Sequence, residues 1–106
     1  MDVDERKKMR EKAIENKIKA YLKTIKGLYF FKEHGGLYGA AGVPDIICCY
    51  KGLFIALEVK APDGKLTVLQ EATIRRIKDA YGIAEVVRSV EDVKTIIGGI
   101  NETKKI

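Results

Sequence analysis

Two β-prone segments joined by a two-residue turn constrain the fold of this 106-residue chain more than any other feature. Residues 43–50 are rich in Ile and Cys, residues 53–60 are largely apolar, and Lys51-Gly52 between them has the composition of a tight turn. The two segments are therefore expected to pair as an antiparallel hairpin. Unless a bulge intervenes, the turn fixes the register and places residue 45 opposite residue 58.

Helical and strand periodicities predict five further elements around this hairpin. The intervals are 4–26, 67–81 and 90–97 for the helices and 28–33 and 83–88 for the strands, with a glycine after each helix. The expected order is α-β-β-β-α-β-α. Because a helix separates the hairpin from the last strand, at least one pair of strands should be parallel. The predicted fold class is α/β, with a small mixed sheet flanked by helices.

The length and composition predict one domain, residues 1–106, with 46% hydrophobic residues. Its core is expected within about residues 11–97, because Gly98-Gly99 should stop the last helix and leave 98–106 as a tail. No apolar run approaches the roughly 20 residues that a membrane span needs. The only two cysteines are neighbours in the sequence and cannot link distant loops, so a cytoplasmic location is expected.

The charge balance is compatible with a polyanionic partner such as DNA. Lys and Arg outnumber Asp and Glu by 20 to 15, which gives a formal net charge of +5. Of this excess, +4 lies in residues 1–26, where nine basic residues accompany five acidic ones. Four glycines in residues 34–42 predict a loop that a nucleic-acid backbone could approach closely, and His34 and Tyr38 are expected to be ordinary exposed residues of that loop.

Three charged residues stand in the hairpin rather than on a helix: Asp45, Glu58 and Lys60. Glu58 and Lys60 share one face of their strand, and the hairpin register brings Asp45 to the same end. Two carboxylates and an amine could hold Mg²⁺ or Mn²⁺, which prefer oxygen ligands and take further ligands from phosphate. Spacing alone favours a plainer interpretation, a surface ion pair at a strand end.

The sequence around these residues is similar to a known nuclease signature. Gly42-Val43-Pro44-Asp45, followed by Leu57-Glu58-Val59-Lys60, resembles the PD-(D/E)XK motif. The whole block 42–70, which closes on Gly64-Lys65-Leu66-Thr67-Val68-Leu69-Gln70, resembles the virus-type replication-repair nuclease (VRR-NUC) domain. The joined block is far more specific than the short motif, and the resemblance extends over residues 14–93.

This resemblance implies a restriction-endonuclease-like core and a role for each matching residue. Asp45 and Glu58 would bind the divalent metal, Mg²⁺ or Mn²⁺, together with the backbone carbonyl of Val59. Lys60 would position or deprotonate the attacking water and stabilise the phosphate. Gln70 would orient the lysine or the substrate phosphate. Each role comes from the family and is an expectation for this chain.

Gln70 has an alternative in its own surroundings. It shares a helical stripe with Ile74, Ile77 and Tyr81, which predicts an inward position where its amide needs hydrogen-bond partners. A glutamine at a helix start can equally bond to the backbone.

The family also has a glutamate on its first helix, which would be catalytic and is a further candidate ligand of the metal. Glu15 is chosen here because Ile18 and Leu22 follow it at the expected spacing, and Glu11, one helical turn earlier, is the alternate. Lys19 follows Glu15 at i+4, so a solvated ion pair on the helix surface is equally compatible with the sequence.

The implied function is a metal-dependent DNA endonuclease that hydrolyses phosphodiester bonds and leaves 3′-hydroxyl and 5′-phosphate ends. One chain would hold one site, so cutting two strands requires two chains, and a twofold homodimer is expected. Stand-alone members of the family resemble Holliday-junction resolvases, which suggests branched DNA as the substrate and a phage or prokaryotic origin. The alternatives are a non-cleaving nucleic-acid-binding module, a nuclease subunit that needs a partner, and an interaction domain with incidental charges.

Overall fold

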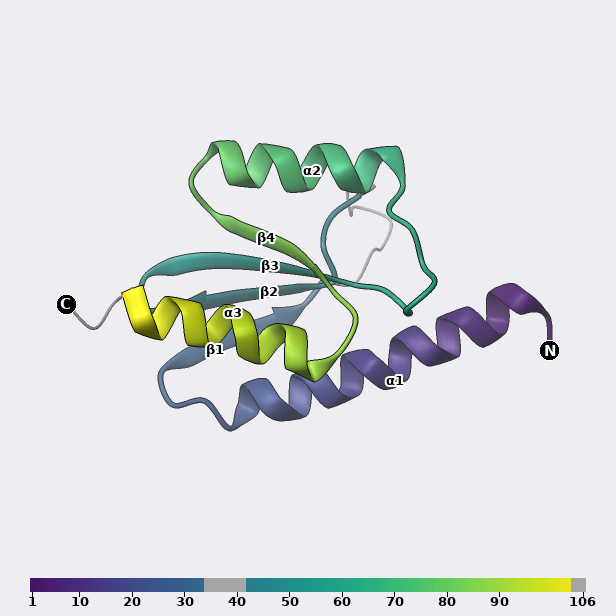
Figure 1. The fold of residues 1–106 in the computed structure, drawn as a ribbon, viewed down its shortest axis with the longest axis horizontal. Helices are drawn as coiled ribbons and strands as arrows, with labels where there is room; N and C mark the ends of the chain where they lie inside the picture. The colour runs from purple at the N-terminus through teal and green to yellow at the C-terminus, as the bar shows by residue number, and fades with distance from the viewer. Residues whose placement is uncertain (34–41, 104–106) are drawn as a thin grey trace.

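The computed structural model describes residues 1–33 and 42–103, which form a four-stranded mixed sheet with helices on both faces (Figure 1). The strands lie in the order β1-β2-β3-β4, and the predicted α/β class and α-β-β-β-α-β-α order are confirmed. None of the described helices is long and apolar enough to cross a membrane. The elements are α1 (Val3–Lys23), β1 (Leu28–Lys32), β2 (Ile46–Tyr50), β3 (Leu53–Val59), α2 (Val68–Asp79), β4 (Ile83–Val87) and α3 (Val90–Thr103).

The hairpin register is the one that its turn predicts. β2 pairs antiparallel with β3, and Ile46 lies opposite Leu57, so the next pair outward is Asp45 and Glu58. The turn at Lys51-Gly52 has φ values of 53° and 78°, as a tight two-residue hairpin requires. After the crossover through α2, β4 pairs with β3 in parallel, which confirms the predicted parallel pair.

The core lies between the sheet and two helices, α1 and α3, which pack side by side on one face (Figure 1). Asp2 caps α1 by accepting a hydrogen bond from the Glu5 N–H at 2.8 Å. Alternate residues of each strand point into this core, because successive side chains face opposite sides of a sheet. The buried set is Ile18, Leu22, Ile46, Cys48, Tyr50, Ile55, Leu57, Val59, Val87, Val93, Ile97 and Ile100.

On the opposite face of the sheet α2 packs against β4, and it lies at the top of Figure 1. Gly42 approaches this helix so closely that a Cβ at that position would lie 2.7 Å from the carbonyl oxygen of Leu69. Its φ of +86° also favours glycine, so the chain entering β2 is held against the start of α2. On the β2 strand itself, Cys48 is buried in the core and Cys49 is exposed on this outer face, as expected for neighbours in a strand.

The predicted end of the last helix is wrong. Gly98-Gly99 do not stop it, because α3 continues to Thr103 and buries Ile100 against the core. The Tyr50 hydroxyl also donates a hydrogen bond to Asn101 Oδ1 at 2.9 Å. Two glycines cost a helix roughly 2 kcal/mol relative to alanine, and the burial of one isoleucine offsets most of that. Residues 98–103 are therefore part of the packed structure and not a tail.

The predicted stripe of the middle helix is wrong at its last member. α2 ends at Asp79, and Tyr81 adopts a φ of 68° and is 95% exposed. The chain reverses there because Gly82 packs directly on Ile77, where a Cβ would come within 2.7 Å. Tyr81 consequently points into solvent and does not share a face with Gln70.

Candidate active site

Asp45 is fixed at the open end of the hairpin, immediately before β2. Its Oδ2 accepts a hydrogen bond from the Val59 N–H at 2.8 Å, and its backbone carbonyl accepts one from the Glu33 N–H at 2.7 Å. Pro44 favours an extended backbone for the residue before it and so directs the chain into the strand. The Asp45 side chain remains 29% exposed, so the carboxylate is anchored to the sheet and still reaches solvent.

Glu58 and Lys60, at the end of β3, are both buried. They are 3% and 8% exposed, and their i, i+2 spacing puts them on one face of the sheet. A surface ion pair, the interpretation that spacing alone favoured, is therefore wrong. Charged side chains are seldom buried without a specific role, because the loss of hydration is costly.

The burial of Glu58 has a direct electrostatic consequence. Burial is the main cause of a rise in the pKa of Glu58 from 4.5 to about 9, and the neighbouring Asp45 carboxyl is the next cause. Lys60 acts in the opposite direction and lowers this pKa. Glu58 Oε1 is buried and has no hydrogen-bond partner among the residues that the structure describes. A buried carboxyl beside a second carboxyl, with an unused oxygen, is an arrangement that a cation would stabilise.

Glu15 is the buried carboxylate of α1, at 5% exposure, and three lysines surround it. Its Oε1 lies 2.7 Å from Lys32 Nζ, and its Oε2 lies 3.2 Å from Lys12 Nζ and 3.4 Å from Lys19 Nζ. Burial raises the pKa of Glu15, but the hydrogen bonds from Lys32 and Lys12 outweigh it and lower that pKa below its ordinary value. The ion pair with Lys19 that the sequence allowed is present, but the carboxylate is not solvated.

Lys32 links this carboxylate to the hairpin. Its Nζ also lies 3.4 Å from Asp45 Oδ1, and its side chain is 21% exposed. Burial lowers the pKa of Lys32, but the hydrogen bond to Glu15 and the charge of Asp45 outweigh it and raise that pKa above its ordinary value. Sequence reasoning missed this residue. The only available signal was its place in the strand at 28–33, whose register with residues 43–50 could not be known across the intervening loop.

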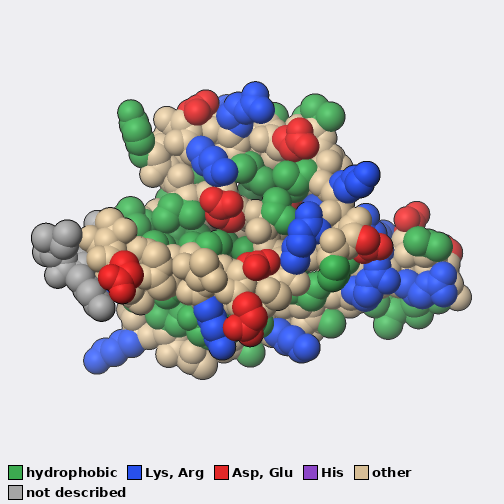
Figure 2. All heavy atoms as spheres, viewed as in Figure 1, with side chains coloured by type: hydrophobic (Ala, Val, Ile, Leu, Met, Phe, Trp, Pro, Cys, Tyr) green, Lys and Arg blue, Asp and Glu red, His purple; other side chains and the backbone are tan. Residues whose placement is uncertain are grey.

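A cavity of about 170 Å³ lies over these groups. Both glutamates of α1 that the sequence singled out line it, so the structure brings Glu11 and Glu15 to the same place, with Glu15 the more deeply buried. Figure 2 shows Lys and Arg side chains gathered over the N-terminal part of α1, at the right of the view. The cavity is lined by Lys8, Glu11, Lys12, Glu15, Lys32, Asp45 and Val59.

Gln70 bonds to the backbone at the start of its helix, which is the alternative that the sequence left open. Its Oε1 accepts a hydrogen bond from the Thr67 N–H at 2.9 Å, and its N–H donates to Thr67 Oγ1 at 3.1 Å, which together form a capping box. Gln70 is only partly buried at the start of α2. His34 and Tyr38 lie outside the described residues.

The turn that follows Lys60 is held by a residue that the sequence did not single out. The Arg88 guanidinium, just after β4, donates to the carbonyl oxygens of Ala61 at 2.6 Å and Gly64 at 2.8 Å. It thereby fixes the backbone between Lys60 and α2. An arginine after a strand gives no sequence signal for this role, because the contacted carbonyls are more than 20 residues away.

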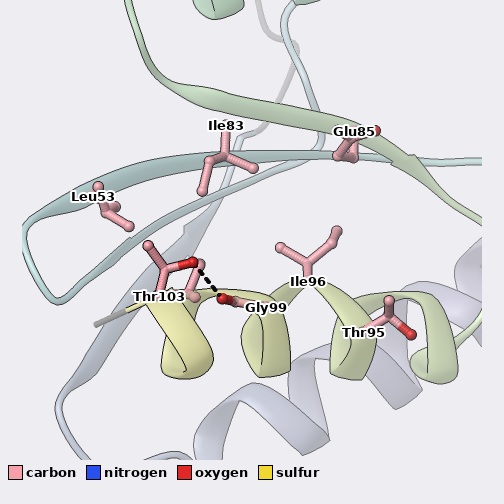
Figure 3. A pocket seen from close by; sticks show the side chains of 8 residues that line it. Leu53, Ile83, Glu85, Thr95, Ile96, Gly99 and Thr103 are labelled. Atoms are coloured by element: carbon pink, nitrogen blue, oxygen red, sulfur yellow. Dashed lines mark hydrogen bonds between the residues drawn. The ribbon is translucent and has the colours of Figure 1, made fainter. Parts of the chain in front are cut away.

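An apolar cleft of about 440 Å³ lies elsewhere, between α3 and the starts of β3 and β4 (Figure 3). Leu53 and Ile83 form one wall and Ile96 and Gly99 the other, and Glu85 is its only acidic residue. It is at the opposite end of β3 from Glu58, so it takes no part in the carboxylate site.

The site contains few protein groups for a metal. Among the described residues there is no cluster of three or more His, Cys, Asp or Glu side chains arranged around a metal position. Mg²⁺ sites in enzymes that act on phosphates often use only one or two carboxylates, with waters and substrate oxygens completing the shell. Asp45 and Glu58 correspond to that number.

Comparison with known proteins bears on the fold of the chain. No protein-family model matches the sequence, and no curated protein matches it. A solved structure described as a VRR_NUC domain superposes on 84% of this chain and 95% of its own length, with a TM-score of 0.70 and 21% sequence identity. The chain has the fold of a VRR-NUC domain, as the motif in residues 42–70 predicts.

Proposed function

We propose that this protein is a metal-dependent DNA endonuclease that hydrolyses phosphodiester bonds at the Asp45–Glu58–Lys60 site. The observation that supports this most is the buried Glu58 carboxyl, which lies beside Asp45 and has one oxygen without a hydrogen-bond partner among the described residues. A purely structural ion pair would leave neither a carboxyl oxygen without a partner nor two carboxyl groups side by side. The VRR-NUC fold supports the same reaction class.

The residues fit a divalent cation. Asp45 and Glu58 would supply carboxylate oxygens and Val59 its backbone carbonyl, which is a hard-oxygen set that suits Mg²⁺ or Mn²⁺. The Val59 N–H already donates to Asp45 Oδ2 at 2.8 Å, so the start of β2 and the end of β3 are held together before an ion binds. When bound, the cation would polarise the phosphate and lower the pKa of a water at the site.

The chain's own residues would then divide the remaining work. Lys60 Nζ, held in a buried position, would position or deprotonate the attacking water. It could also donate a hydrogen bond to a phosphate oxygen as negative charge grows there. Glu15 is proposed as the catalytic carboxylate of α1, with Glu11 the alternate and metal ligation a further candidate role. Gln70 would have to leave its capping box to reach the substrate, so its orienting role is the one least supported by the observed contacts.

Branched DNA, such as a Holliday junction, is the proposed substrate, by analogy with stand-alone proteins of this fold. The decisive experiment is a nicking assay on a four-way junction, a flap, a splayed arm, a duplex and a single strand, each with Mg²⁺, Mn²⁺ or EDTA. Metal-dependent cutting that disappears in Asp45→Asn supports the nuclease. Binding without cutting of any substrate would instead support the non-cleaving module or a nuclease subunit that needs a partner.

The proposed assembly is a homodimer that uses the outer face of β1 and β2. Two rows of side chains run across this face and onto β3 by strand register, Tyr29–Cys49–Phe54 and Phe31–Ile47–Ala56, and the second row ends at Ala56, which is buried. Tyr29, Phe31 and Phe54 are 68%, 43% and 47% exposed. Neither row contains a charge, although 33% of the residues in the chain are charged.

A second copy is the occupant that fits this face best. A twofold interface must be complementary to itself, which an uncharged aromatic surface satisfies. The excess positive charge lies on α1, on the opposite side of the sheet, so pairing here keeps the two basic helices apart. DNA would require phosphate-binding lysines or arginines among these rows, and the rows have none.

We expect Phe31→Lys to convert the dimer to a monomer, because each chain would bring an ammonium group into an uncharged interface. Light scattering coupled to size exclusion measures the mass. Met9→Lys is the matched control, since Met9 is an exposed apolar residue, at 58%, on α1. Wild-type protein that is monomeric at every concentration would contradict the assembly, and so would a Phe31→Lys variant that remains a dimer.

A further inference from the structure

We propose that the Lys32 ammonium is a fixed internal cation of the active site, which bridges Glu15 to Asp45 and limits the chain to a single divalent ion. The inference rests on the proposed function, because it concerns how many ions that site accepts. It assigns Lys32 as a positioning residue and removes Glu15 from the candidate metal ligands.

The position of Lys32 is determined by the sheet. β1 pairs with β2 so that Lys32 lies opposite Ile46, the residue after Asp45. Its side chain points toward α1, on the same face as Phe30, and reaches Glu15 there. The Nζ lies 2.7 Å from Glu15 Oε1 and 3.4 Å from Asp45 Oδ1. The ammonium thus occupies the space between the two carboxylates, where a second cation would have to bind.

The charges around Glu15 already balance its own charge. Lys12 and Lys19 take its other oxygen, so a divalent ion at Glu15 would approach three ammonium groups at close range. Like charges a few ångströms apart and partly shielded from water repel strongly. A second ion between Glu15 and Asp45 is therefore disfavoured while Lys32 is present.

Asp45 can still serve the first ion. Its Oδ1 contacts Lys32 and its Oδ2 accepts from the Val59 N–H, but each carboxylate oxygen has two lone pairs. The Asp45 oxygens consequently keep acceptor capacity for an ion shared with Glu58, which lies opposite Asp45 on the neighbouring strand. The bridge holds the Asp45 carboxylate in one orientation before any ion arrives.

The test is a titration of metal-free protein with Mn²⁺ alone, in the absence of DNA. Electron paramagnetic resonance and calorimetry measure the number of ions bound. We expect about one bound Mn²⁺ per chain for wild type and about two for Lys32→Met, which removes the ammonium and keeps a similar side-chain length. The double variant Lys32→Met with Glu15→Gln should return to about one, because the second ion loses its carboxylate. Lys32→Arg should also bind about one, because it keeps the positive charge.

Lys19→Met is the matched control, since Lys19 contacts Glu15 but not Asp45 and its loss should leave the stoichiometry unchanged. A wild-type chain that binds two ions, or a folded Lys32→Met variant that still binds one, would overturn the inference and leave the proposed nuclease intact. Should Lys32→Met fail to fold, the wild-type and Lys32→Arg values still decide, because two ions in either refute it. A wild-type chain that binds no Mn²⁺ would overturn the proposed metal site itself.

Discussion

A Glu58→Gln variant should cut DNA at least about a thousandfold more slowly than wild type and, without metal, should unfold at a higher temperature. The loss of activity is expected because the amide removes a negative ligand of the metal. The gain in stability is expected because Glu58 is 3% exposed with an oxygen that has no partner among the described residues, whereas a glutamine is neutral and can donate to Asp45. The two effects have one origin, a carboxylate kept in an environment that suits it only when a cation is present.

The stability difference should depend on pH. Folding raises the pKa of Glu58 from 4.5 to about 9, so the folded chain binds a proton there that the unfolded chain has lost. The contribution of this group to stability is therefore complete below about pH 4.5 and is lost progressively as the pH rises through about 9. The slope is at most about 1.4 kcal/mol per pH unit for one group.

Thermal melts of metal-free protein in EDTA, at several pH values between about 5 and 9, measure this difference. Glu58→Gln and wild type should melt together at the acidic end and separate as the pH rises, by about 4–8 °C for each kcal/mol in a domain of this size. Mn²⁺ should raise the melting temperature of wild type and leave that of the variant nearly unchanged. Parallel pH profiles would mean that Glu58 is ionised in the fold and that its environment is more polar than its burial indicates.

A Lys60→Met variant should lose about three to four orders of magnitude in cleavage rate and keep its affinity for DNA. Lys60 is 8% exposed at the end of β3, so its ammonium is placed for the reacting phosphate rather than for general attraction of the DNA backbone. Methionine fills a similar volume, and an apolar side chain in a buried position has no desolvation cost. The fold should therefore survive the change with a melting temperature close to that of wild type.

Single-turnover nicking with Mn²⁺ and fluorescence anisotropy with labelled DNA separate the two effects. Lys51→Met is the control, because Lys51 is an exposed lysine in the turn at the other end of the hairpin and its loss should leave cleavage near the wild-type rate. If Lys60→Met lowered binding and cleavage by the same factor, Lys60 would be a DNA-binding residue with no role in the chemical step. If cleavage persisted, the water would have to be activated by another group.

The hairpin and the grouping of residues at its open end could be predicted from the sequence because they are local. A two-residue turn leaves one register, and that register alone brings Asp45 beside Glu58. Periodicity likewise predicted every helix and strand in order. It failed at Gly98-Gly99 and at Tyr81, because local propensity is weaker than the packing of Ile100 in one case and the close approach of Gly82 to Ile77 in the other.

The environment of the site could not be predicted, because it depends on contacts between distant segments. Burial turns Glu58 and Lys60 from a plausible surface pair into ionisable groups kept from water, and burial is decided by how the helices close over the sheet. Lys32 reaches Asp45 only through the pairing of β1 with β2, across a connection whose length leaves the register undetermined. The sequence by itself determined which chemical groups share one end of the hairpin. Only the tertiary structure decided how far these groups are exposed to solvent and that Lys32 contacts Asp45. The reason is that electrostatic energies depend on neighbours from every packed element, whereas hairpin register depends only on its own turn.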